Sequence, residues 1–174
     1  MNLMIDLETL DTKPSGVILS VGICAFDMDG IHDKKNFLLD ATEQQKLGRT
    51  ISFDTIEWWL QQSKPVIDAS FNIPIDQKTT IDEFLKDFGY FCSKNNIQKV
   101  WAQGIDFDIS MIADLHRSKG VELPYSFWLV RDSRTIRDGN RFIEPERKGD
   151  HHNAMDDAVY QAECVIIALK EKGL

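Results

Sequence analysis

Several features that mark whole classes of protein are scarce or missing in this sequence. Its 174 residues contain no apolar run of about 18, so we expect no segment that spans a membrane. The three cysteines are odd in number, widely spaced and without a CxxC pair, which argues against a disulfide framework or a zinc finger. The first residues, MNLMIDLETL, lack a basic region and carry acids, so no signal peptide is expected. Together these shortages indicate a reduced, cytoplasmic protein.

Positive charge is also in short supply. Twenty Lys and Arg stand against 28 Asp and Glu, giving a net charge of −8, which argues against a protein that coats nucleic acid. Residues 131–148 are the exception, with a net charge of +2 that leaves −10 for the rest. The basic residues of this segment are Arg131, Arg134, Arg137, Arg141, Arg147 and Lys148. On charge alone, a solvated polar loop is the simpler interpretation.

The apolar content of 43% suits a packed core, and without internal repeats or linkers residues 1–174 are expected to form one domain. Strands are expected at 3–7, 17–26, 35–39, 99–102 and 127–130. Helices are expected at 53–62, 80–94, 108–119 and 153–172, with Asp54 as a candidate N-cap of the first. Three strands followed by alternating helices and strands predict an α/β fold: a mixed sheet flanked by helices.

Paired carboxylates stand on the first expected strand. Asp6 and Glu8 are two residues apart, so a strand projects both to one side, where like charges repel. A divalent cation between them would relieve the repulsion, and Mg²⁺ prefers such oxygen ligands. The alternative is a strand that simply ends at a solvent-facing rim, and this two-acid motif alone does not exclude it.

Two further acidic motifs stand at expected helix starts. Asp106 and Asp108 follow a strand and open a helix, where either could serve only as an N-cap. In HHNAMDDA, His152 lies in the loop before the last helix and Asp157 lies about one turn inside it. Histidine titrates near neutral pH and can take up a proton, although acids at a helix start also stabilise the helix by themselves.

One chemistry accounts for all three motifs. Phosphodiester hydrolysis can use two cations about 4 Å apart, held by several carboxylates, together with a neutral base that deprotonates water. In this interpretation Asp6, Glu8, Asp108 and Asp157 are the metal ligands and His152 is the base.

The motifs DLET at 6–9, DFD at 106–108 and HNAMDD at 152–157 resemble the three exonuclease motifs of the DEDDh family. SGVILSVGICAFD, DTIEWWLQQ and RDSRTI are similar to segments of its phage exonuclease A and ribonuclease AS subgroup. The resemblance implies a ribonuclease H-like fold, whose five-stranded mixed sheet has an antiparallel second strand. It also implies 3′→5′ removal of nucleotides from single-stranded DNA or RNA with two Mg²⁺ or Mn²⁺ ions.

Relatives bind the terminal nucleotide just after the first acids, which here are followed by Thr9 and Leu10. Asp11 then stands where many members have glycine, a change that could crowd or recharge the rim of that pocket. Trp58 and Trp59 are neighbours on an expected helix and cannot face the same way, so one should pack inward and the other lie near the substrate. We take Trp59 as the candidate for substrate contact.

Arg131 and Arg134 are the candidate contacts to backbone phosphates. Relatives are often dimers, so a homodimer is a reasonable expectation. Two other functions remain open at this point: an inactive nucleic-acid-binding module and a phosphatase acting on small phosphoesters. The first would retain no metal binding, and the second would prefer free nucleotides to oligomers.

Overall fold

The computed structural model describes residues 1–138 and 144–173, and a five-stranded sheet lies at its centre. The strands are β1 (Asn2–Thr9), β2 (Ile18–Phe26), β3 (Ile31–Leu38), β4 (Lys99–Ala102) and β5 (Val130–Asp132). Their order across the sheet is β3-β2-β1-β4-β5. β2 is antiparallel to both neighbours, whereas β4 and β5 run parallel to β1. The expected mixed sheet with an antiparallel second strand is therefore confirmed.

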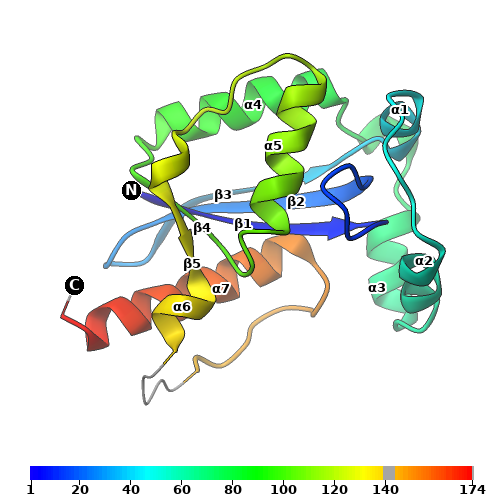
Figure 1. Cartoon of the computed structure of the whole chain (residues 1–174). Coiled ribbons are helices and arrows are strands. Elements are labelled where there is room, and N and C mark those ends of the chain that lie inside the picture. Colours follow the sequence, from blue (N-terminus) through cyan, green and yellow to red (C-terminus); the bar gives the residue numbers. More distant parts are fainter. Residues whose placement is uncertain (139–143, 174) are drawn as a thin grey trace.

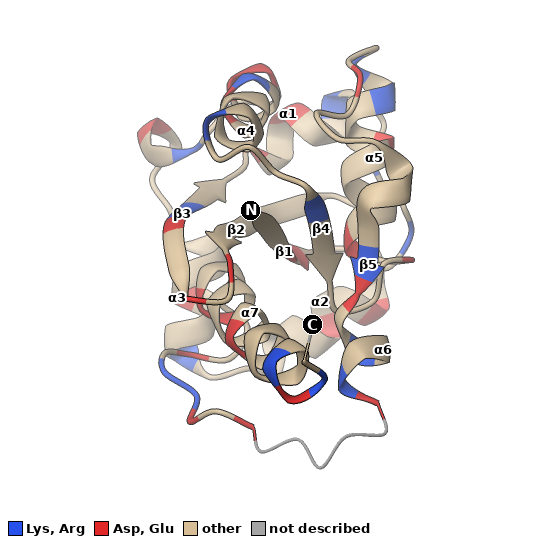
Figure 2. Cartoon of the chain, turned by 90° about the vertical axis from the view of Figure 1, so that its left-hand side faces the viewer, with Lys and Arg blue, Asp and Glu red and all other residues tan. Residues whose placement is uncertain are grey.

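Helices cover both faces of this sheet. α4 (Ile81–Lys94) and α5 (Asp108–Ser118) lie on one face, and α7 (Ala154–Glu171) lies on the other (Figures 1 and 2). Every residue of β2 is buried, which explains why its sequence ILSVGICAF is apolar without alternation. The carboxyl end of β1 is thereby held rigidly between two packed layers.

A group of short helices lies beyond the carboxyl end of β1 (Figure 1). It comprises α1 (Ala41–Lys46), α2 (Phe53–Leu60), α3 (Lys64–Phe71) and the 3₁₀ turn η1 (Ile75–Gln77). Only α2 was expected from the sequence, and its N-cap is Ser52, so the assignment of Asp54 as the cap was wrong. Asp54 lies in the first turn instead.

The last strand also differs from its prediction. Phe127–Leu129 form a 3₁₀ turn, β5 covers Val130–Asp132, and the unpredicted α6 spans Ser133–Arg137. The apolar run was misleading because Phe127 and Trp128 are 79% and 64% exposed rather than buried. Arg141 of the basic segment lies outside the described residues. Among the described helices, none is long and apolar enough to cross a membrane.

Candidate active site

Four carboxylates from three elements meet at the carboxyl end of β1. Asp6 and Glu8 project from β1, Asp108 begins α5, and Asp157 lies in the first turn of α7. The backbone N–H of Leu7 donates to Asp108 Oδ1 at 3.1 Å, which joins α5 to β1 between the two acids of that strand. Residues more than 100 positions apart in the sequence thus form one acidic cluster.

Gly22 allows α7 to approach this cluster. It is the register partner of Asp6 on β2, and a Cβ at this position would lie 2.0 Å from the carbonyl oxygen of Ala154. Real Cβ atoms do not approach backbone this closely, so a larger residue would push the start of α7 away from the sheet. The missing side chain brings Asp157 within reach of Asp6 and Glu8.

Hydrogen bonds orient the carboxylates. Gln161, one turn after Asp157 on α7, donates from Nε2 to Asp6 Oδ1 at 2.6 Å. The backbone N–H of His152 donates to Asp157 Oδ2 at 2.9 Å. Each bond fixes one oxygen of a carboxylate, as the outer contacts of a metal site do.

The electrostatics of the cluster are unfavourable for four separate anions. Burial raises the pKa of Asp6 well above its usual value, and the charges of Asp108, Glu8 and Asp157 raise it further. Burial raises the pKa of Glu8 to about 8, with Asp157 and Asp108 adding to the effect. Burial also raises the pKa of Asp108 to about 7, against the hydrogen bond from Leu7 and the positive charge of Arg134. Such shifts are typical of functional sites.

The donor set fits a hard divalent cation. Ligand atoms of Glu8, His152 and Asp157 all lie within 4.8 Å of one another. Carboxylate oxygens suit Mg²⁺ or Mn²⁺, and the imidazole lies close enough to act on a water beside such an ion. A cation would also remove the repulsion that raises these pKa values. The residues present therefore fit the metal that the sequence predicts.

His152 has an unusual backbone conformation. Its φ is +62°, a left-handed value that few residues other than glycine adopt. The hydrogen bond to Asp157 holds this conformation, and the imidazole meets the ring of Trp58 edge-on, with centroids 4.8 Å apart. Strained backbone of this kind is concentrated at active sites. The backbone hydrogen bond thus keeps residue 152 beside the acids, and Trp58 contacts its imidazole ring.

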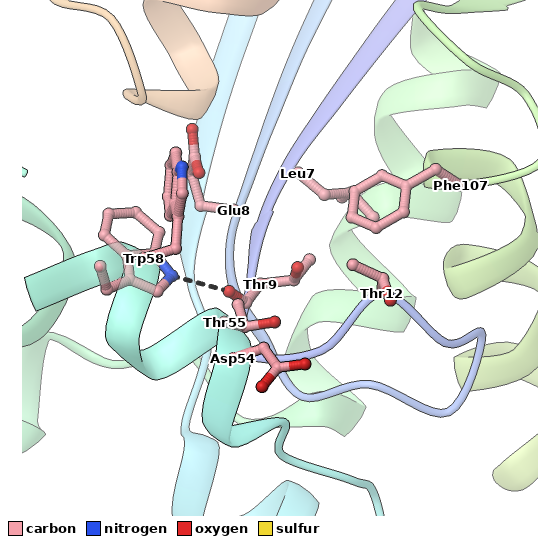
Figure 3. A pocket seen from close by; sticks show the side chains of 9 residues that line it. Leu7, Glu8, Thr9, Thr12, Asp54, Thr55, Trp58 and Phe107 are labelled. Carbon is pink, nitrogen blue, oxygen red and sulfur yellow. Dashed lines mark hydrogen bonds between the residues drawn. The ribbon is translucent and has the colours of Figure 1, made fainter. Parts of the chain in front are cut away.

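A pocket of about 410 Å³ opens beside Glu8 (Figure 3). It is lined by Leu7, Glu8, Thr9, Thr12, Asp54, Thr55, Trp58, Trp59 and Phe107. Glu8 and Trp58 lie on one side of the opening, and Leu7 and Phe107 lie on the other. Apolar walls with a few hydroxyl and carboxyl groups suit a ligand that has both a flat apolar part and hydroxyl groups.

The two tryptophans divide as expected into one buried and one exposed side chain, and both line the pocket. Trp59 is 2% exposed and donates from Nε1 to the carbonyl oxygen of Thr9 at 2.9 Å, so it anchors α2 to β1. Trp58 is 40% exposed and contacts His152. Trp58 therefore offers the larger free surface at the pocket, while the choice of Trp59 for substrate contact stays a prediction.

Leu10 and Asp11 turn away from the pocket. Leu10 packs in a cluster with Val17, Leu19 and Trp59, and its backbone N–H donates to the carbonyl oxygen of Val17. Asp11 Oδ1 accepts the backbone N–H of Thr12 at 2.7 Å, which turns this carboxylate into its own loop. The aspartate in place of glycine thus serves the loop rather than the pocket rim, and Thr9 is the neighbour that lines the pocket.

The two predicted arginines lie in different environments. Arg134 has its guanidinium beside Gly104, and its charge favours ionised Asp108, so it belongs to the acidic site. Arg131 donates from Nη1 to the carbonyl oxygens of Trp128 and Val130 at 2.7 Å, which holds it along the exposed edge of the sheet. The structure therefore brings the charge of Arg134 close to Asp108, whereas Arg131 is bonded to its own strand and turn.

Sequence reasoning missed two residues that touch the acids. Gln161 lies on the inward face of α7 between Ala158 and Ala162, and a buried polar residue among alanines is a detectable signal. Arg147 donates to Asp157 from the segment before α7. Its only signal was its place in the basic segment, which did not distinguish it from its neighbours.

Comparisons with known proteins point to exonucleases. The model of a family described as the 3′-5′ exoribonuclease Rv2179c-like domain matches residues 1–169. The exodeoxyribonuclease of Enterobacteria phage T4 is 28% identical over 158 residues, covering 76% of this chain and 68% of the phage protein.

Two solved structures resemble the fold. The nuclease domain of 3′hExo, a DEDDh family member, bound to rAMP, has a TM-score of 0.64 and 12% identity, covering 98% of this chain and 92% of its own. Exonuclease X in complex with 5′ overhanging duplex DNA has a TM-score of 0.54 and 17% identity, covering 100% and 94%. These matches confirm the ribonuclease H-like fold.

Proposed function

Because the chain belongs to the Rv2179c-like 3′-5′ exoribonuclease domain family and is a DEDDh-type 3′→5′ exonuclease, we propose that it releases nucleoside monophosphates from the 3′ ends of single-stranded nucleic acid. The observation that carries the proposal is the convergence of Asp6, Glu8, Asp108, Asp157 and His152 beside one pocket. A binding module has no use for four repelling acids at a surface that must accept phosphate.

The four carboxylates would hold two Mg²⁺ or Mn²⁺ ions. Such ions supply Lewis-acid stabilisation of phosphate oxygens and a more acidic water. Gln161 and the backbone of Leu7 orient Asp6 and Asp108, so these carboxylates are held in position before substrate arrives. Asp157 is likewise oriented by the backbone N–H of His152.

His152 is the proposed base that takes the proton from the attacking water. Its backbone N–H donates to Asp157 and its ring contacts Trp58, so the position of the imidazole is restricted before substrate binds. A neutral imidazole suits proton transfer near pH 7. The same contacts link the base to the acids, so base and ligands are positioned together.

The pocket is the proposed site of the terminal nucleoside. Trp58 offers a stacking surface for the base, and Thr9, Thr12 and Thr55 offer hydroxyl groups to the sugar. The family is described as an exoribonuclease domain, while the phage T4 relative is named an exodeoxyribonuclease. The proposed substrates therefore include both RNA and DNA. Arg134 is the proposed contact to the phosphates near the acids, and Arg131 is the proposed contact to a more distant part of the strand.

The test is a time course with matched single-stranded DNA and RNA oligomers labelled at the 5′ end. We expect shortening from the 3′ end with Mg²⁺ or Mn²⁺, and none with chelator or in Asp6→Asn. Unchanged oligomers with both metals would refute the exonuclease. Faster hydrolysis of free nucleotides than of oligomers would instead support a small-phosphoester phosphatase.

We further propose that residues 1–174 act as one exonuclease domain in the cytoplasm and assemble as a homodimer. Strands from residue 2 to residue 132 join one sheet, which supports a single domain. Three free, buried cysteines suit a reducing compartment: Cys24, Cys92 and Cys164. The exposed Phe127 and Trp128 beside the edge strand β5 offer an apolar surface to a second copy. Light scattering after size exclusion would measure the oligomeric state.

A further inference from the structure

Arg147 lies on one of the four acids. Its Nη1 donates to Asp157 Oδ1, and its guanidinium carbon lies 4.1 Å from the centroid of the Tyr160 ring. The side chains of the pair are only 22% and 13% exposed. The contact is therefore a half-buried ion pair with a cation–π contact behind it, rather than a freely solvated surface pair.

The segment that carries Arg147 is fixed on both sides. Before it, Glu144 accepts from Arg137 Nη2 at 2.5 Å and from the Tyr160 hydroxyl at 3.0 Å. After it, the backbone N–H of Asp150 donates to Asp156 Oδ2 at 3.0 Å. The fold thus delivers this guanidinium to the site by several independent contacts.

The ion pair engages an oxygen that the proposed mechanism needs. Asp157 Oδ2 accepts the backbone N–H of His152 and Oδ1 accepts Arg147 Nη1, so these two donors together engage both oxygens of this carboxylate. An arginine cannot lose its proton in a protein, so it competes with any other cation for the same oxygen. Once displaced, a guanidinium presents a planar fork that fits the oxygens of a phosphodiester.

We propose that Arg147 is a substrate-binding residue that leaves Asp157 when a divalent cation binds and then holds a nonbridging oxygen pair of the phosphodiester. The second part of this inference, binding of the phosphodiester, rests on the proposed function. Metal binding and substrate binding are then coupled through one side chain: the cation releases the guanidinium, and the released guanidinium strengthens capture of the anionic substrate. Such coupling is reciprocal, so each ligand strengthens binding of the other.

The first test needs no activity. Calorimetric titration of Mn²⁺ without nucleic acid would compare wild type, Arg147→Gln and Lys148→Gln, where the last loses the same charge at an exposed neighbour. We expect Arg147→Gln to bind Mn²⁺ roughly tenfold more tightly because a competing charged hydrogen bond is gone. Lys148→Gln should stay within about twofold of wild type, since exposed charges are screened. Equal or weaker Mn²⁺ binding by Arg147→Gln overturns the proposal.

The second test measures substrate binding at saturating Mg²⁺. Arg147→Gln should raise KM for a single-stranded oligomer roughly tenfold and reduce the slope of affinity against salt by about one, as expected for one lost phosphate contact. Arg147→Lys keeps the positive charge but lacks the planar guanidinium, so its KM should lie between those of wild type and Arg147→Gln. Tighter Mn²⁺ binding with an unchanged KM overturns phosphate capture. If wild type shortens no oligomer, the proposed function fails, while the Mn²⁺ titration still decides whether Arg147 competes for Asp157.

If Arg147→Gln does not fold, which circular dichroism would show, Arg147→Lys takes its place in both tests. Its Mn²⁺ affinity should exceed that of wild type because a lysine ammonium lacks the planar guanidinium that lies over the Tyr160 ring and so holds the carboxylate less firmly. An Arg147→Lys protein that matches wild type in both Mn²⁺ affinity and KM overturns the proposal.

Discussion

Replacing Glu8 with glutamine should stabilise the metal-free protein while abolishing its activity. Glu8 is 8% exposed, and its pKa rises from 4.5 to about 8 through burial and the nearby acids. At 1.36 kcal/mol per pH unit, this difference corresponds to roughly 5 kcal/mol of native-state penalty above pH 8. We expect about half of it to be recovered, because Asp6 and Asp108 share the repulsion and relax together. The gain is then about 2–3 kcal/mol, or roughly 5–10 °C in Tm.

The sign of the pH dependence follows from linkage. Between pH 4.5 and about 8 the native state holds a proton on Glu8 that the unfolded state has lost. The stability of wild type therefore falls as pH rises through this window, and Glu8→Gln lacks that part of the fall. The two proteins should differ little near pH 4.5 and most above pH 8.

Thermal unfolding in chelator at pH 5 and pH 8.5 would measure the effect. Glu57→Gln, at an exposed position of α2, is the matched control and should melt like wild type at both values. Adding Mg²⁺ should raise the Tm of wild type more than that of Glu8→Gln, because only wild type has the full acidic cluster. A Glu8→Gln protein that is no more stable than wild type at pH 8.5 in chelator would show that burial and repulsion do not raise this pKa.

Three further substitutions test the geometry of the site. Gly22→Ala places a Cβ 2.0 Å from the carbonyl oxygen of Ala154, so we expect a loss of about 1–3 kcal/mol in unfolding free energy and of roughly 10²-fold in kcat. The control Gly89→Ala meets open space within α4 and should be neutral or stabilising. An active and stable Gly22→Ala protein would contradict the close approach of α7. His152→Ala should lower turnover by about 10²–10⁴-fold while Mn²⁺ still binds in calorimetry, and near-normal turnover would remove the histidine from the role of base. Trp58→Ala should weaken binding of a single-stranded oligomer by roughly 1–3 kcal/mol, measured by fluorescence anisotropy, and unchanged affinity would leave this ring with only its contact to His152.

The main elements and the acids could be predicted because their signals are local. β2 is an unbroken apolar run, and such a run must be buried on both faces. Asp6 and Glu8 share a side because a strand has a period of two, whatever surrounds it. Asp157 and Gln161 lie about one turn apart on the same side of α7 because a helix has 3.6 residues per turn. Where the pattern was weak, as in the exposed run at Phe127, the prediction failed.

Proximity between distant segments could not be read from the sequence. Whether Trp58 or Trp59 packs inward depends on how α2 lies against the end of β1, and Asp11 turns inward because its own loop supplies backbone donors. Arg147 is one of several basic residues in its segment, and only the packing of that segment against α7 selects it to reach Asp157. The sequence by itself determined which groups the chain carries and which face of each element they occupy, because backbone geometry sets these locally. Tertiary structure decided which groups meet, because that depends on packing between residues far apart in the chain.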